Sequence, residues 1–401
     1  MPRLVLLLAL VFIESLSTIL IERGSYFYCK HHLGFSDAWN LSLALAFGIA
    51  YAFGALTSHP VCARLGEKRV LAAAMAAQLL VHAGMGLAPT SLVLFVGGTL
   101  TGLLNGQKWP VVESYVTAGQ TPLRTARILG YFNFSWALAV PAALVAAGPL
   151  IQWNTWSLFA LAGALNVVTL SLVALLPRRP WHLPQDHPER PGPHQARRLT
   201  GLMHAGRFLM LASYSGMWIL AALLPGIFRE LRCSIEQATS YSAALDITRL
   251  IAFAILGIWT GWYGRAYPLI IAMPILAGGF SMVIFGTNLG IVLGGELMFG
   301  AAAGIIYFAS LYYAIVVKNA SVEAGGGHEG LIGSGFALGP LAGLIGLTLE
   351  SHIGSRVGGI LLGVAPIFCV CYALAARSLI RLGVSRDAGD AGDVGDVGDK
   401  R

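Results

Sequence analysis

The sequence predicts an all-α polytopic membrane protein with twelve transmembrane helices in two pseudo-symmetric six-helix bundles. Of the 401 residues, 56% are hydrophobic and 11% are charged, whereas about 25% of the residues of an average soluble domain are charged. Long apolar stretches recur along nearly the whole chain, and about 20 such residues cross a hydrocarbon layer about 30 Å thick as a helix. An internal repeat divides these helices into two halves. An uneven distribution of basic residues predicts their orientation in the membrane.

Apolar windows bounded by turn residues and charges place the twelve helices. The first six are expected near residues 3–27, 37–58, 70–88, 91–116, 124–147 and 154–177, and the second six near 205–228, 236–260, 266–287, 289–317, 328–350 and 357–380. The first apolar run follows Arg3 as in a secretion signal, but it continues through Glu14 to about Tyr26 without a small-residue cleavage pattern. We therefore expect it to remain as the first membrane helix.

Two stretches between or after the helices have a different composition. Residues 178–203 combine prolines, histidines and arginines, which break helices and favour water. We expect them to form a cytoplasmic linker between an N-terminal bundle, residues 1–177, and a C-terminal bundle, residues 204–382. Residues 383–401 repeat Gly-Asp-x and have little apolar surface to bury, which predicts a disordered tail.

The positions of Lys and Arg predict the orientation in the membrane. If the first residue is cytoplasmic, 19 basic residues lie near inner helix ends, and five near outer ends: Arg23, Lys30, Arg229, Arg232 and Arg356. We therefore predict a multi-pass plasma (inner) membrane protein with both termini in the cytoplasm. The net charge of +7 does not indicate nucleic-acid binding, because the basic residues form no continuous patch.

Two matching segments show that the halves are related. Leu33 and Gly66 in the first half are 33 residues apart, as are Leu231 and Gly264 in the second. The serine three residues after each leucine stands where an N-cap would begin the next helix. This ungapped register predicts two parallel six-helix repeats.

The loops around these glycines, between the second and third helices of each half, resemble the major facilitator superfamily pattern G-x-x-x-D-R/K-x-G-R/K-R/K. They match it at Arg64, Gly66 and Lys68 in the first copy and at Gly257, Gly264 and Arg265 in the second. With the two repeats and the basic linker, the resemblance covers the chain up to the tail. The resemblance implies that these positions form cytoplasmic gating loops. Glu113 and Arg127 are also assigned to the gating loops. The first copy lacks the aspartate, which implies a weaker cytoplasmic latch.

Ionisable residues inside the predicted helices are few, because each costs about 2.5–3.5 kcal/mol at a helix centre. The resemblance implies that helices one, four, seven and ten line the cavity. Glu14 in helix one is the first candidate for proton coupling or substrate contact, and the alternative is a static ion pair with Lys108. Asp246 and Arg249 are three residues apart on one helix, which favours a structural ion pair. If Lys108 and Arg249 both point inward, an anionic substrate is expected.

Polar and aromatic side chains complete the predicted pathway, because they can stack on and hydrogen-bond a ring-bearing solute. Glu296 in helix ten lies nearer the outer end, where an interfacial role is the alternative. The predicted solute and proton pathway is Glu14, Asn105, Lys108, Trp109, Asn133, Tyr214, Trp218, Asp246, Arg249, Glu296 and Tyr307.

No metal or cofactor is expected. Cys29, His31 and His32 cluster in the first outer loop, but no fourth ligand is near in the sequence. His328 and Glu329 are expected to satisfy the N-terminus of the eleventh helix. The sequence has no Walker-type phosphate loop, and no nucleophile, base and orienting group stand at spacings that indicate an enzyme.

The resemblance implies a secondary active transporter that moves a small organic solute by alternating access, driven by a proton or other ion gradient. We favour proton-coupled export by a monomer, because the candidate pocket residues are aromatic and acidic. Uptake of an organic anion or sugar-like solute by proton symport is the alternative. A receptor or assembly factor that keeps the fold without transport is an alternative of another class, favoured by the weakened loop motif and opposed by the retained intramembrane charges.

Overall fold

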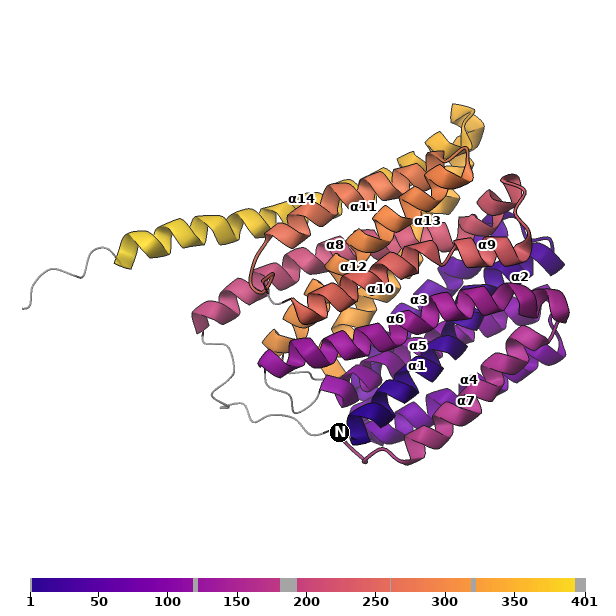
Figure 1. Cartoon of the computed structure of the whole chain (residues 1–401), viewed down its shortest axis with the longest axis horizontal. Helices are drawn as coiled ribbons and strands as arrows, with labels where there is room; N and C mark the ends of the chain where they lie inside the picture. Colours follow the sequence, from indigo (N-terminus) through magenta and orange to yellow (C-terminus); the bar gives the residue numbers. More distant parts are fainter. Residues whose placement is uncertain (1, 118–121, 181–192, 260, 319–321, 394–401) are drawn as a thin grey trace, which may run out of the picture.

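The computed structural model describes residues 2–117, 122–180, 193–259, 261–318 and 322–393, and within these ranges the regular elements are all helices (Figure 1). The first half contains α1 (Pro2–Glu22), α2 (Gly24–His32), α3 (Asp37–Leu65), α4 (Glu67–Leu87), α5 (Ser91–Thr117), α6 (Pro122–Trp153) and α7 (Ser157–Ala174). The second half contains α8 (Pro193–Glu230), α9 (Ile235–Tyr241), α10 (Ala244–Ile258), α11 (Tyr267–Phe285), α12 (Leu289–Lys318), α13 (Val322–Ile353) and α14 (Arg356–Asp393).

Six membrane-length segments lie in each half. In the described residues, eleven helical segments are long and apolar enough to cross a membrane, with α1 and α2 forming one of them and α9 and α10 another. The twelfth is α5, a helix of 27 residues whose mean hydropathy is lowered by the polar residues Asn105, Gln107 and Lys108. The predicted all-α fold of two six-helix bundles is therefore confirmed.

The repeated segments fold alike in the two halves. Ser36 accepts a hydrogen bond from the backbone N–H of Trp39, and Ser234 forms a capping box with Gln237. Gly66 and Gly264, the glycines 33 residues after the matched leucines, have φ angles of 87° and 65°, which glycine adopts without steric strain. Each half therefore turns at the same point of its repeat.

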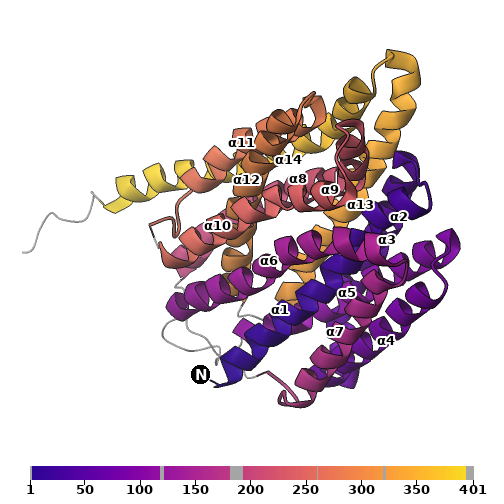
Figure 2. The same cartoon turned by 45° about the vertical axis from the view of Figure 1, so that its right-hand side comes forward.

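The halves lie side by side, one coloured indigo to magenta and the other pink to yellow (Figures 1 and 2). They meet where α3 packs on α13 and where α6 packs on α10. At Gly48 of α3, a Cβ atom would overlap the carbonyl group of Phe336 in α13, so a side chain there would separate the two helices. We call the end of the bundle where α1 and α13 begin the α1 end, and the opposite end the α2 end.

Several helix boundaries differ from the sequence predictions, and three of these differences lie at the predicted linker, at the tail and at the eleventh helix. Helix α8 begins at Pro193, inside the predicted linker, because proline fits the first turn of a helix; residues 181–192 lie outside the described ranges. Helix α14 continues to Asp393, through the first part of the predicted tail, and residues 394–401 are not described. Helix α13 begins at Val322 rather than near residue 328.

Candidate functional site: a cavity between the two halves

A cavity lies between the two halves. Its wall comes from α1, α3, α5 and α6 of the first half and from α8, α10, α12 and α13 of the second. A solute in this cavity touches both halves at once, so a relative movement of the halves changes its surroundings.

Aromatic rings form much of the cavity wall. Trp218 and Phe336 stack with ring centroids 3.5 Å apart and planes inclined by 17°. Trp136 packs edge-on against Tyr307, with centroids 5.4 Å apart. Flat apolar faces of this kind suit a planar ring, because aromatic pairs gain from offset or edge-to-face contact.

Two arginines in the wall share one carboxylate. Arg23 of the first half donates a hydrogen bond to Oδ2 of Asp246 in α10, and Nη2 of Arg249 lies 2.8 Å from Oδ1 of the same residue. The predicted pair of Asp246 and Arg249 is therefore present, and Arg23 extends it across the two halves. Glu22, which also lies on the cavity wall, is near both guanidinium groups.

The structure contradicts the position that the sequence analysis predicted for Arg23. It was expected among the basic residues near outer helix ends, but it is only 4% exposed and it lines the cavity. The reason is that the first membrane segment extends to His32 rather than ending near Tyr26, which places Arg23 well inside it.

Arg249 has hydrogen-bonding capacity that the protein does not use. Its guanidinium lies over the ring of Trp136, 4.7 Å from the centroid, and Nη1 is 3.2 Å from the thioether sulfur of Met217. A thioether is a weak acceptor, and Nε of Arg249 has no hydrogen-bond partner among the described residues. This buried cation is therefore open to a better acceptor.

Three glutamates, Glu22, Glu113 and Glu329, also line the cavity. Glu329 accepts a hydrogen bond from the hydroxyl of Tyr51. Because α13 begins at Val322, Glu329 and His328 are buried inside the helix and do not satisfy its N-terminus as the sequence suggested.

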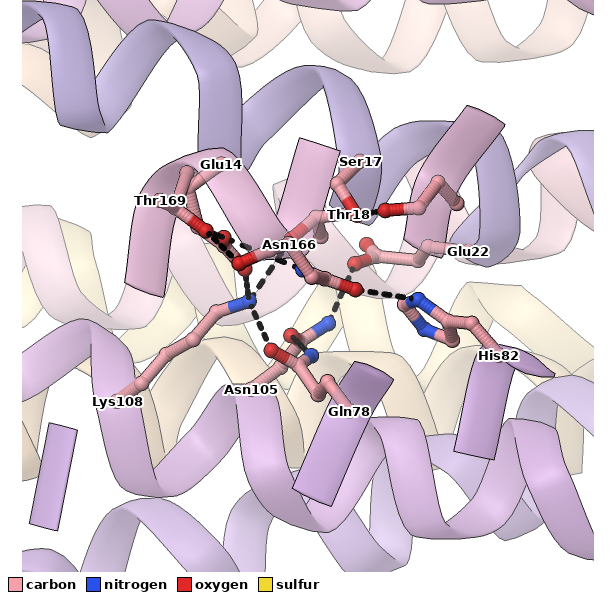
Figure 3. A network of polar contacts seen from close by, with 11 residues as sticks. Glu14, Ser17, Thr18, Glu22, Gln78, His82, Asn105, Lys108, Asn166 and Thr169 are labelled. Carbon is pink, nitrogen blue, oxygen red and sulfur yellow. Dashed lines mark hydrogen bonds and ion pairs between the residues drawn. The ribbon is translucent and has the colours of Figure 1, made fainter. Parts of the chain in front are cut away.

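Glu14 and Lys108 form a separate buried network beside the cavity (Figure 3). Lys108 donates hydrogen bonds to Glu14, to Thr18 Oγ1 at 3.0 Å and to Gln78 Oε1 at 2.9 Å. Thr169 donates to the other oxygen of Glu14 at 2.8 Å. Both charges are fully buried, so their environment is that of a satisfied ion pair, the alternative considered for Glu14.

This network reaches the cavity through Glu22 (Figure 3). Gln78 donates to Asn105 at 2.6 Å, and Asn105 donates to Glu22 at 3.3 Å. On the other side, Asn166 connects Glu14 to the ring of His82. Asn105 and Lys108 themselves do not line the cavity; Asn105 contacts Glu22 and Lys108 contacts Thr18, which do.

The remaining predicted pathway residues divide between the wall and the protein interior. The cavity wall includes Trp109, Tyr214, Trp218, Arg249 and Tyr307. Asn133 accepts a hydrogen bond from the indole of Trp136 at 3.0 Å. Glu296 is fully buried away from the cavity, and neither carboxylate oxygen has a hydrogen-bond partner among the described residues.

The predicted gating loops lie at the α1 end. Lys68 donates hydrogen bonds to the carbonyl oxygens of Ala174 and Leu176, both at 2.7 Å. It thereby provides hydrogen-bond donors for carbonyl groups at the C-terminal end of α7. Gly257 of α10 meets Gly130 of α6 across the halves, where a Cβ on Gly130 would lie 3.0 Å from the Cα of Gly257. Three other basic residues of these loops are exposed: Arg64, Arg127 and Arg265.

The sequence model of the Major Facilitator Superfamily matches residues 6–344. The chain belongs to the major facilitator superfamily. A gallate transporter of Pseudomonas putida is 27% identical in an alignment of 408 positions that covers 86% of each protein. The family consists of membrane transporters rather than enzymes, so the protein is a multi-pass membrane transporter.

Solved structures confirm the fold. The human organic anion transporter MFSD10 (TETRAN) superposes with a TM-score of 0.64 at 14% identity, covering 94% of this chain and 100% of that one. The nucleoside transporter NupG gives 0.63 at 13% identity, with 95% and 99% covered. A bacterial homolog of the human lysosomal transporter Spinster, in an inward-facing and unoccupied conformation, gives 0.62 at 16% identity, with 95% and 94% covered. The solutes in the first two names are small organic molecules.

Proposed function

We propose that the protein takes up a small aromatic carboxylate together with protons by alternating access. The observation that carries this proposal is Arg249, a buried cation on the cavity wall whose Nη1 faces a thioether and whose Nε faces no acceptor, while Nη2 pairs with Asp246. A carboxylate binds a guanidinium through two parallel charge-assisted hydrogen bonds. An aromatic ring on the same solute would stack among the rings of the wall.

The ring and the charge are recognised by neighbouring groups. Trp136, which stacks under Arg249, also contacts Tyr307 and Phe253. A solute with its carboxylate on Arg249 would therefore place its ring against aromatic faces. The gallate transporter among the relatives is named for an aromatic carboxylate, which supports this substrate class.

Binding of the anion is connected to movement of the halves through Asp246. This carboxylate holds Arg23 of the first half and Arg249 of the second. A substrate carboxylate competes with Asp246 for the same guanidinium groups. Substrate binding would thus weaken one link between the halves and allow them to move.

The charge of the solute makes protons necessary for its uptake. Moving one negative charge inward against a potential of about 100 mV costs about 2.3 kcal/mol, and accompanying protons cancel that charge. For uptake we therefore propose proton symport, the alternative considered from the sequence. The distribution of Lys and Arg supports an inner-membrane location with both termini in the cytoplasm.

Exchange in proteoliposomes tests the substrate class. Vesicles loaded with unlabelled gallate should accumulate labelled gallate. Benzoate should compete about 10- to 100-fold better than phenol, because it adds a hydrogen-bonded charge worth about 1.5–3 kcal/mol. Acetate should compete poorly because it has no ring. Equal competition by phenol and benzoate, or no gallate exchange, would exclude the proposed substrate.

A further inference from the structure

Glu22, the last residue of α1, is a carboxyl group on the cavity wall that the proposed function leaves without a role. Its side chain is 8% exposed, and it lies at the edge of the network in Figure 3. Among the described residues it accepts one hydrogen bond, from Asn105 at 3.3 Å, and it belongs to none of their ion pairs. A buried carboxylate is costly without close partners, so the protonation of Glu22 depends on the charges around it.

The groups around Glu22 come from both halves of the molecule. The charged ones are Arg23, Lys108, Arg249 and Glu329, and the phenols are Tyr26, Tyr51 and Tyr214. Lys108 already holds Glu14, and Asp246 pairs with both arginines. The cation that the proposed solute would occupy, Arg249, is therefore also one that Glu22 faces.

Bound solute changes the balance of charge at this place. In the empty cavity, two arginines, Arg23 and Arg249, stand beside two acids, Asp246 and Glu22, and these charges cancel when Glu22 is ionised. A solute carboxylate on Arg249 adds a third negative charge near Glu22, in a largely buried site where such charges interact strongly. Protonation of Glu22 removes the excess, because a carboxyl group beside a like charge favours its neutral form.

We infer that Glu22 binds the proton that is transported with the solute. The proton passes from water to a carboxylate oxygen of Glu22 when a solute carboxylate binds Arg249, and it returns to water when that solute leaves. This inference rests on the proposed proton-coupled uptake and assigns a site to its ion.

The position of Glu22 on the wall produces net movement of the proton. Glu22 and Arg249 line the same cavity, so both are open to the same side of the membrane in each state. Solute and proton bind together from outside, and both leave together into the cytoplasm. The empty cavity and the fully loaded cavity are balanced in charge, whereas the two half-loaded forms are not. Closing the cavity around an unpaired charge is costly, so the empty protein returns without the proton.

Glu329 of α13 is the acid to compare with Glu22, because it lies on the same cavity wall. Tyr51 donates a hydrogen bond to it. Its carboxyl group also lies within 4.8 Å of ligand atoms of Glu113 and His328. Its protonation therefore depends on these close neighbours, whereas that of Glu22 depends on whether Arg249 is occupied.

Calorimetric titration of the purified protein with gallate, in two buffers of different ionisation enthalpy at one pH, measures the protons taken up on binding. Wild type should take up about one proton, and its affinity should fall by about tenfold per pH unit where Glu22 of the empty protein is ionised. Glu22→Gln should take up none and bind gallate equally across this range, because its amide is neutral and still accepts from Asn105. Glu329→Gln should take up the proton, as should the control Glu350→Gln at the opposite end of α13.

Transport gives a second readout of the same change. In proteoliposomes, Glu22→Gln should keep gallate exchange, which needs no net proton movement. Net gallate uptake driven by a pH gradient should fall by about tenfold or more, in the range of ordinary coupling between two sites.

The contrary outcomes differ from one another. Absence of gallate binding and exchange in wild type would contradict the proposed function itself. Gallate binding by wild type without proton uptake would overturn the inference alone, whether or not the variants fold. Proton uptake that persists in Glu22→Gln, or that disappears in Glu329→Gln, would place the proton on another group and overturn it. Loss of gallate binding in a Glu22→Gln protein that is folded by gel filtration would also overturn it, because Glu22 would then hold the solute.

Discussion

Lys108 and Arg249 are both buried cations inside membrane helices, but their surroundings differ. Lys108 donates to three oxygen acceptors, which is the full capacity of an ammonium group. Arg249 has an ion pair on one side and a thioether or no acceptor on the other. A satisfied charge stabilises the fold, whereas unused donors at a cavity wall favour a ligand.

Replacing Arg249 by Lys should therefore weaken substrate binding. Lysine keeps the charge, but it cannot make two parallel hydrogen bonds to a carboxylate or lie flat on Trp136. We expect the affinity for gallate to fall by about tenfold, which equals about 1.4 kcal/mol, as measured by isothermal titration of the purified protein. Arg232→Lys, at an exposed position, is the matched control, and equal affinities for the two variants would argue against Arg249 as the anion site.

Replacing Glu14 by Gln should lower stability. The change leaves the fully buried Lys108 without its carboxylate, and breaking a buried pair in this way costs about 3–5 kcal/mol. We expect a lower melting temperature in detergent with unchanged gallate affinity, and recovery of stability in the double variant Glu14→Gln with Lys108→Met. A stable Glu14→Gln protein that has lost only proton-driven uptake would instead make Glu14 a coupling acid.

At the scale of helices, close approach between the halves depends on small residues. Gly48 of α3 lies against the backbone of Phe336 in α13, where there is no room for a methyl group. Helices in lipid associate through this kind of tight packing. The contact of α3 with α13 is therefore part of the cavity wall, since Phe336 also lines the cavity.

Gly48→Ala should hold α3 and α13 apart. Because the added Cβ would overlap backbone atoms of α13, we expect the exchange of gallate to be impaired while insertion into the membrane is normal. Gly84→Ala in α4 is the control, because a Cβ there meets nothing within 4 Å. Exchange rates in proteoliposomes, normalised to the amount of inserted protein, measure the effect, and equal rates for the two variants would contradict it.

At the scale of the whole molecule, one ion pair of a small charge cluster connects the halves at the α2 end. Arg356, at the start of α14, pairs with Asp37 of α3 and also lies 2.6 Å from Glu230 of α8. Lys30 of α2 lies 2.9 Å from Asp37. These groups are partly exposed, so each pair contributes at most about 1 kcal/mol, an amount suited to a contact that would open in the proposed alternating access.

Arg356→Gln should shift the protein toward a state open at the α2 end. Spin labels at the exposed positions Leu92 in α5 and Ile291 in α12 report the separation of the halves there. We expect longer distances in Arg356→Gln than in wild type, and a smaller difference at high salt, where surface ion pairs are screened. Arg232→Gln at the same end is the control, and identical distances in all three proteins would show that these pairs do not hold the halves together.

The amino-acid sequence alone was enough to predict the helices, the two halves and the family, because these depend on local or repeated patterns. Apolar length decides whether a segment spans the membrane, and the spacing from Leu33 to Gly66 recurs in the second half. The pair of Asp246 and Arg249, three positions apart on one helix, was predicted in the same way. All of these are visible within one helix or one repeat.

Which charges of the first half meet charges of the second half could be seen only after folding. Arg23 and Asp246 are 223 positions apart, and Glu113 and Glu329 come from different halves. The same folding placed Glu14 beside the cavity rather than on its wall. Hydrophobic periodicity shows that a helix crosses the membrane but does not fix how far it rotates or slides against its neighbours. Packing of small residues such as Gly48 sets that rotation and depth, and thereby determines which buried charges face the cavity.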